Sequence, residues 1–255
     1  AFHEVLEGMH VIDVLSAAEP PEENAAVLLA LIDVWNRCFL GRGSMAIVPY
    51  AHRLRALPAH VQQVSMESLG KGVCQNSNNP ETATGPVVWG APGTDAQHAF
   101  FQLLHQGTDV VPVDLIAVAR PLTDDDRSVH GQDLLVANLI AQADALAFGR
   151  TPDEVRTEGV PEDLVAHQMF PGNRPSTTIL MPELSPSTLG QLIALYENRT
   201  IAMAALLGLN PFDQWGVELG KELATRIGDG LTNRDGAQDP SATELLRRYR
   251  SLREG

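Results

Sequence analysis

The sequence predicts an α/β protein in which a parallel sheet is sandwiched between helices, with additional helices at both ends of the chain. Short apolar stretches alternate with longer stretches of helical periodicity, which is the order that right-handed β–α–β crossovers require. The apolar stretches are continuous rather than alternating, as in strands covered on both faces. A chain of 255 residues, 44% of them hydrophobic, can bury one such core or two smaller ones.

The expected elements follow one another in a regular order. Strands are predicted at 45–50, 86–90, 109–119 and 177–184. Helices are predicted over residues 1–40, interrupted by the acidic loop SAAEPPEEN, and then over 51–72, 95–106, 128–149, 186–207 and 212–227. The stretch GDGLTNRDGAQDP, 228–240, is typical of a mobile linker, and ATELLRRYRSLREG of a short terminal helix with a basic face.

This order predicts three regions along the chain. Residues 1–44 form a helical segment that packs on the core, residues 45–227 form the α/β domain, and residues 228–255 form the linker and the C-terminal helix. In parallel α/β sheets, ligands bind at the carboxyl ends of the strands. We therefore expect functional side chains in the loops that follow the strands.

Composition excludes several classes of function. A net charge of -14 argues against nucleic acid as a partner, because a polyanion would be repelled. No apolar run is long enough to span a membrane, and AFHEVLEGMH lacks the pattern of a signal peptide. Cys38 and Cys74 show neither disulfide nor zinc spacing. The simplest location is the cytoplasm, and the missing initiator Met fits a processed or truncated piece.

The stretch HVQQVSMESLGKGV places Gln63, Glu67 and Lys71 in one row of a helix, beside an apolar stripe. One interpretation is a solvated ion pair between Glu67 and Lys71, which would stabilise the helix by roughly 0.2–0.5 kcal/mol. The other is a functional row. Lys71 and Lys221 are the only lysines among eighteen basic residues, and a retained lysine indicates a need for a compact ammonium group.

His98 follows the strand predicted at 86–90. Thr94 and Gln97 have the spacing of a capping box, which predicts a helix start at Thr94 and puts His98 in its first turn. The positive end of the helix dipole would keep the imidazole neutral and ready for acid–base chemistry. The alternative is a structural histidine bonded to a backbone carbonyl. His105, seven residues on, is weak evidence of a metal site.

The stretch LNPFDQWGVELGKELATRI predicts another helix, with Asn210 as its N-cap. Gln214, Glu218 and Lys221 then fall along one face. Gly216 and Gly220, four residues apart, would leave a neighbouring strip of the helix surface without side chains, so that a ligand or another backbone could approach closely. Tight helix packing is the alternative reason for these glycines.

Together these motifs supply a set of groups suited to one kind of chemistry. Glu67 supplies a carboxylate base, His98 an acid–base ring and Lys221 a cationic donor, while Gln63 and Gln214 supply amides. Such a set suits proton abstraction next to a carbonyl, although it does not specify that reaction uniquely.

Longer motifs carry a resemblance. The stretches VQQVSMESLGK, GPVVWGAPGTDAQHAFFQLLHQGTD, LLVANLIAQADALAFGRT, FPGNRPSTTILMPELSPSTLGQLIALYENRT and NPFDQWGVELGKELA occur in this order. From residue 1 to about residue 230 the chain resembles the carboxyl-terminal part of glucose-6-phosphate isomerase. GTDAQHAF and FDQWGVELGK are the most specific of these motifs.

The resemblance implies a sugar-isomerase (SIS-like) domain that interconverts glucose 6-phosphate and fructose 6-phosphate without a metal or organic cofactor. By matching motif positions, Glu67 would move a proton between C1 and C2 through a cis-enediol. His98 would open the sugar ring with help from Lys221, while Gln63 and Gln214 would line the pocket. The resemblance also implies a homodimer in which His98 is donated across the interface.

The chain departs from the family in three ways. Leu69, two residues after the base Glu67, replaces an Asn that is usual in the family. Asn198 stands where a His is common. The family's phosphate-binding loop and its Gly-Gly-Arg belong to an amino-terminal part that no stretch here matches. GNRPSTT, 172–178, has residue types that suit phosphate, but we interpret it as a structural loop. We therefore expect the chain to be inactive alone, and a non-catalytic sugar-phosphate-binding or dimerisation module is the alternative.

Overall fold

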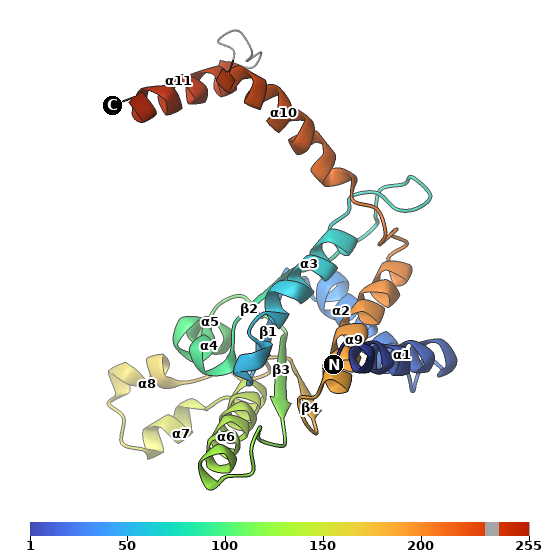
Figure 1. Ribbon diagram of the computed structural model, residues 1–255. Helices are drawn as coiled ribbons and strands as arrows, with labels where there is room; N and C mark the ends of the chain where they lie inside the picture. Colours follow the sequence, from blue (N-terminus) through green and yellow to red (C-terminus); the bar gives the residue numbers. More distant parts are fainter. Residues whose placement is uncertain (233–239, 255) are drawn as a thin grey trace. The chain divides into compact units, whose positions relative to one another are not determined.

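The computed structural model describes residues 1–232 and 240–254 (Figure 1). The chain forms two compact units, Ala1–Pro211 and Phe212–Gly255. The first unit contains the sheet, and the described part of the second is helical. The division at residues 44 and 227 stays a prediction.

The sheet has four parallel strands: β1 (Ser44–Pro49), β2 (Val87–Gly90), β3 (Val113–Val118) and β4 (Ser176–Met181). Their order is β2-β1-β3-β4, so β1 and β3 are central. Each observed strand overlaps one predicted strand, although β1 and β4 begin one residue earlier than predicted, and the predicted α/β class is confirmed. Both central strands are buried almost throughout, whereas residues of the edge strand β4 alternate between more and less exposed.

Helices cover both faces of this sheet (Figure 1). The helical elements of the first unit are α1 (Phe2–Ala18), α2 (Ala25–Val34), the π-helical turn η1 (Trp35–Phe39), the 3-10 turn η2 (His52–Leu54), α3 (Leu57–Leu69), α4 (Gly93–Ala99), α5 (Phe101–Gln106), α6 (Asp126–Phe148), α7 (Pro152–Thr157), α8 (Glu162–Gln168) and α9 (Pro186–Leu206). Alternate residues of β1 enter two separate cores, because successive strand residues point to opposite faces. Ala46 and Val48 pack with α4, α5 and α6, while Met45 and Ile47 pack with α3 and α9.

Helix α1 lies against α9 at two glycines. A Cβ atom on Gly8 would stand 2.0 Å from the carbonyl oxygen of Ser187, and one on Gly190 would stand 2.0 Å from that of Val5. The helices can therefore approach this closely only because neither glycine has a side chain. Asn198 adds a polar contact, since its Nδ2 donates to Asp13 of α1 over 2.8 Å.

A buried ion cluster joins three elements of the first unit. Arg199 of α9 donates two bonds of 2.6 Å to the two carboxylate oxygens of Asp33 in α2, and a third of 2.6 Å to Asp114 in β3. Tyr196 also donates to Asp114, over 2.9 Å. Burial opposes the charge on Arg199, but the Asp114 and Asp33 carboxylates outweigh it and raise the pKa of the guanidinium well above its usual value. The cluster is held as paired charges.

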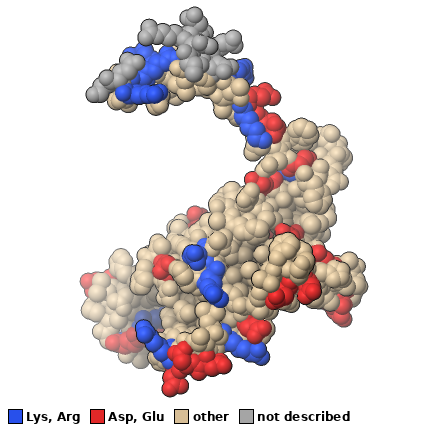
Figure 2. Space-filling model, viewed as in Figure 1, with Lys and Arg blue, Asp and Glu red and all other residues tan. Residues whose placement is uncertain are grey.

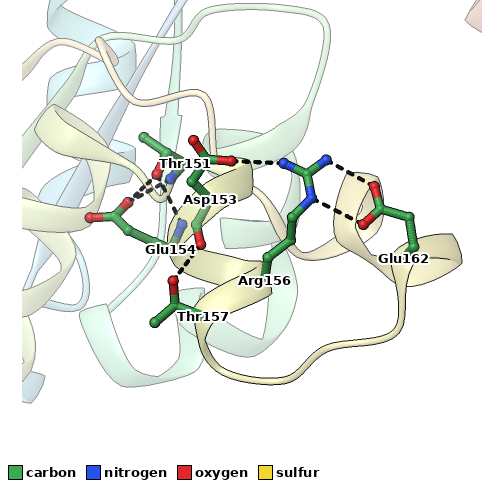
Figure 3. A network of polar contacts seen from close by, with 6 residues as sticks. All are labelled: Thr151, Asp153, Glu154, Arg156, Thr157 and Glu162. Atoms are coloured by element: carbon green, nitrogen blue, oxygen red, sulfur yellow. Dashed lines mark hydrogen bonds and ion pairs between the residues drawn. The ribbon is translucent and has the colours of Figure 1, made fainter.

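An exposed arginine makes a similar pair of contacts on the surface (Figure 3). Arg156 of α7 donates to Asp153 over 2.8 Å and to both oxygens of Glu162 in α8, over 2.8 and 3.0 Å. These bonds join α7 and α8, the two short helices between α6 and β4 in the chain. Thr151 caps α7 through a capping box with Glu154.

The second unit departs from the predicted helix boundaries. Its elements are the 3-10 turn η3 (Trp215–Val217), α10 (Glu218–Thr232) and α11 (Pro240–Glu254). Asn210 therefore does not cap a helix, and residues 228–232 belong to α10 rather than to a linker. The rest of the predicted linker, apart from Pro240, lies outside the described residues. The predicted terminal helix is confirmed, and Figure 2 shows basic side chains gathered on α11.

Acidic and basic side chains are interspersed over the part of the first unit that Figure 2 shows. Within residues 1–232 and 240–254, no helix combines the length and the apolar character that crossing a membrane requires.

We expect Arg199→Met to destabilise the first unit by about 3–5 kcal/mol, because it would leave two buried carboxylates without a counter-charge. Urea unfolding followed by far-UV circular dichroism measures the change. Arg156→Met is the matched control, since it removes an arginine between two acids at an exposed position, and it should change the midpoint little. Equal effects of the two substitutions would contradict the role given to the buried cluster.

Candidate functional site

Helix α3 carries two of the predicted site residues at its exposed surface. Val61 and Leu69 are buried beneath it, and Gln63 and Glu67 face outward as predicted. The Nε2 atom of Gln63 donates to the Oε1 atom of Glu67 over 3.4 Å, a long bond that orients the carboxylate only loosely. The helix begins with Pro58 in its first turn and ends at Leu69, where Gly70 follows as C-cap.

Lys71 does not form the ion pair with Glu67 that one interpretation predicted. Lys71 lies beyond the end of α3, and its Nζ atom donates to the backbone carbonyl of Asn210 over 2.5 Å. The solvated i,i+4 pair is therefore wrong. The reason is geometric, since the helix stops two residues after Glu67 and the chain then turns toward the end of α9.

Further bonds join the same two segments, which we call the α3–α9 strap, residues 71–75 and 207–210. The backbone amide of Gln75 donates to Gly208 over 2.8 Å, and its side chain donates to the carbonyl of Leu209 over 2.9 Å. The thiol of Cys74 lies 3.7 Å from the carbonyl of Leu207. The strap fixes the point from which the chain enters the second unit, next to the end of the helix that carries Glu67.

His98 lies on α4, but not where the capping box predicted it. The helix begins at Gly93 after Pro92, without a side-chain cap, so Thr94 is inside it. His98 is exposed and lies in the last turn, away from the positive end of the helix. The dipole argument for a neutral ring is therefore wrong.

His105 has a structural environment. A break at Phe100 separates α4 from α5, so that His105 does not share an exposed face with His98. His105 is buried, and its Nε2 atom lies 2.7 Å from the Oε1 atom of Gln142. The two histidines therefore do not form a pair.

Glu67 and His98 lie at opposite edges of the sheet in one chain. The amide of Gly85, two residues before β2, donates to the carbonyl of Leu69, which places the end of α3 at the amino edge. Gln97, next to His98, donates over 2.9 Å to the hydroxyl of Tyr50, which directly follows β1 at the carboxyl edge. The four residues of β2 between these points span roughly 10 Å. A direct proton relay between the two side chains of one copy is not supported.

Gln214 and Lys221 belong to the second unit, and both are exposed. Gln214 precedes η3 rather than lying in a helix, while Lys221 donates to Glu218 over 2.9 Å as their predicted shared face requires.

The family departures noted in the sequence have structural explanations. Leu69 is buried and packs with Met203 and Leu209, so it belongs to the core rather than to the surface beside Glu67. Asn198 bonds to α1 and to the carbonyl of Ala194. Arg174 of the predicted structural loop is buried and donates to the carbonyls of Gly107 and Asp109. That interpretation of the loop agrees with these contacts.

The strap itself was missed by sequence reasoning, although the scarcity of lysine drew attention to Lys71. A bond between positions 139 residues apart leaves no periodic signal in a sequence. All five predicted side chains are exposed. Alone, these groups can bind and exchange protons with water, but they do not enclose a substrate.

We expect Lys71→Met to loosen the strap without unfolding the chain, because the bonds from Gln75 remain. Hydrogen exchange followed by mass spectrometry should show faster exchange in peptides that cover residues 207–211. Removing one net hydrogen bond of about 1 kcal/mol corresponds to a several-fold increase in local opening. Lys221→Met is the matched control, and unchanged protection in Lys71→Met would show that the bond to Asn210 does not hold the segment.

Three comparisons identify the relatives of this chain. Residues 1–246 match the family model of phosphoglucose isomerase. The chain is 51% identical to glucose-6-phosphate isomerase 1 of Streptomyces avermitilis and 49% identical to glucose-6-phosphate isomerase of Frankia casuarinae. These alignments cover 99% and 98% of the chain and 47% and 46% of the relatives, so the chain spans about half of their length.

The same relationship holds for a solved structure. A glucose-6-phosphate isomerase from Chlamydia trachomatis superposes with a TM-score of 0.84 at 38% sequence identity, over 98% of this chain and 46% of the other. The fold is therefore the SIS-like fold of that enzyme. Similarity in sequence and in fold extends over nearly the whole chain, which belongs to the phosphoglucose isomerase family.

Proposed function

We propose that this chain supplies one part of the machinery that interconverts glucose 6-phosphate and fructose 6-phosphate by ring opening and proton transfer through a cis-enediol. The match to phosphoglucose isomerase over residues 1–246 supports this, together with the presence of Glu67, His98 and Lys221 in the matching motifs. Binding alone would not require a carboxylate base. These three groups favour an enzyme over the alternative of a non-catalytic sugar-phosphate-binding module.

In this proposal Glu67 removes a proton from one of the two adjacent carbons and returns it to the other. Gln63 and Gln214 hold substrate hydroxyls, and Lys221 assists His98 at the ring oxygen. A carboxylate in an enclosed site is better matched to proton transfer near neutral pH than one in water. Since Glu67 is exposed here, we propose that a further part of the protein covers it.

We further propose a homodimer in which His98 acts in the site of the partner copy. The positions of the two groups support this, because Glu67 lies at the amino edge of the sheet and His98 at the carboxyl edge. A second copy can bring its carboxyl edge to the first copy's amino edge. Such an arrangement under two-fold symmetry would create two equal sites.

The proposed reaction needs no metal or organic cofactor, because carboxylate, imidazole and ammonium groups carry each proton transfer. A cytoplasmic location belongs to the same proposal. The group that holds the sugar phosphate and the group that stabilises the enediolate would come from polypeptide outside these 255 residues. We therefore expect the chain to show no isomerase turnover when it is assayed alone.

Supplementing the chain with the separately produced amino-terminal half of the Streptomyces avermitilis relative tests this division. Isomerisation and solvent deuterium exchange at C2 should appear only in the mixture, and Glu67→Gln should reduce both by about 10²–10⁴-fold. Glu81→Gln, at another exposed carboxylate, is the matched control. Binding of sugar phosphate by calorimetry without any exchange would favour the non-catalytic module, and strong activity of the chain alone would contradict the division.

Donation of His98 across an interface can be tested by mixing two inactive variants in the same reconstituted assay. A dimer of one Glu67→Gln copy and one His98→Asn copy contains one site with both native groups and one site with neither. Random pairing should therefore restore about a quarter of the unsubstituted rate, since half of the dimers are mixed and half of their sites are intact. If both groups act within one copy, mixing should restore nothing.

A further inference from the structure

A hollow of about 690 Å³ opens at the amino edge of the sheet. One wall is the loop Leu40–Ser44, which leads into β1, and the other is Thr108–Val110, which precedes β3. None of the residues proposed for isomerisation lines it. The lining offers two hydroxyl groups, on Ser44 and Thr108, and loop backbone, beside the apolar residues Leu40 and Val110.

Three arginines converge on these two loops. Arg42 lies in the wall itself, and its Nη1 atom donates to the side-chain oxygen of Asn36. Arg174 donates to the carbonyls of Gly107 and Asp109, over 2.7 and 3.0 Å, and so holds the second loop from beneath. The Nη1 atom of Arg37 lies 3.8 Å from the point where a Cβ atom on Gly43 would stand.

All three guanidiniums are bonded to neutral oxygens rather than to carboxylates. Arg37 donates to the carbonyl of Thr84 over 2.8 Å, and the partners of the other two are an amide side chain and backbone carbonyls. Within residues 1–232 and 240–254, none of the three forms an ion pair. Asp109 contributes one carboxylate to the lining of the hollow, and this side chain is exposed to solvent.

Such a cluster is unusual in a chain with a net charge of -14. Burial lowers the pKa of Arg42, and the nearby guanidinium of Arg174 lowers it further. Like charges that are held together and only partly solvated favour a bound anion, which would relieve both the repulsion and the lost hydration. Guanidinium groups also match the geometry of phosphate oxygens.

We propose that this hollow binds an oxyanion, namely phosphate or the phosphoryl group of a small metabolite. Arg42 would face the anion with its unused N–H groups, and the hydroxyls of Ser44 and Thr108 would donate to its oxygens. Arg37, beside Gly43, would add positive potential at the wall. Arg174 positions the loop of Thr108 and adds positive potential from below. This site does not depend on the proposed isomerase activity, because it uses none of the same side chains.

Titration of the chain with inorganic phosphate at constant ionic strength, followed by amide NMR shifts, tests the proposal. We expect saturable shifts centred on Gly41, Gly43 and Thr108, and at least a tenfold weaker affinity in Arg42→Met. Arg53→Met is the matched control, since Arg53 is exposed at the carboxyl edge, and it should leave the affinity unchanged. Sodium chloride at the same ionic strength should not produce these shifts.

A second variant protects the test against a misfolded Arg42→Met chain. Thr108→Val changes an exposed side chain by one hydroxyl, and it should weaken phosphate binding several-fold while the circular dichroism spectrum stays the same. The proposal would be overturned if phosphate produced no saturable shifts or if the shifts were centred on other residues. It would also be overturned if the Arg42 and Thr108 variants both bound phosphate as tightly as the unsubstituted chain.

Discussion

The buried bonds of Arg199 are the constraint on which the rest of the first unit depends. They fix α9 against the strand β3 and against α2 at the same time, because one guanidinium serves both Asp33 and Asp114. Three charged groups in an apolar interior are stable only while all three remain paired. This requirement sets the position and rotation of α9 more strictly than apolar contacts could, since apolar packing tolerates small shifts.

The position of the end of α3, the helix that carries Glu67, follows in part from that placement. The end of α9 is where the α3–α9 strap begins, and the strap joins Lys71 and Gln75 to the last residues before the second unit. Within the first unit, the strap therefore joins the end of the helix that carries Glu67 to the segment that follows α9. Positions far apart in the sequence are related here by hydrogen bonds to backbone carbonyls, which do not depend on the identity of the receiving side chain.

Periodicity predicted the strands and the long helices because their burial leaves a regular pattern. The same reasoning failed at helix starts. Thr94 and Asn210 have good capping chemistry, but α4 begins beside Pro92, and the chain after Asn210 continues as turn and 3-10 helix before α10. Local capping energies are small enough for tertiary contacts to override them. Asp114 is an acid inside an apolar run, and that exception could have indicated a buried partner, although not which one.

The exposure of the candidate residues is itself a physical consequence of their chemistry. Burying Glu67 or Lys221 within this chain would cost more than their interactions return, unless each had a partner charge and a substrate in place. A fold that must be stable before substrate arrives therefore keeps such groups at its surface, and in the proposed assembly further polypeptide would enclose them. Glu67 at one edge of the sheet and His98 at the other meet this requirement, because neither edge alone holds a complete and costly set of charges. The separation of the groups thus reconciles the stability of the isolated fold with the proton chemistry proposed for the assembled one.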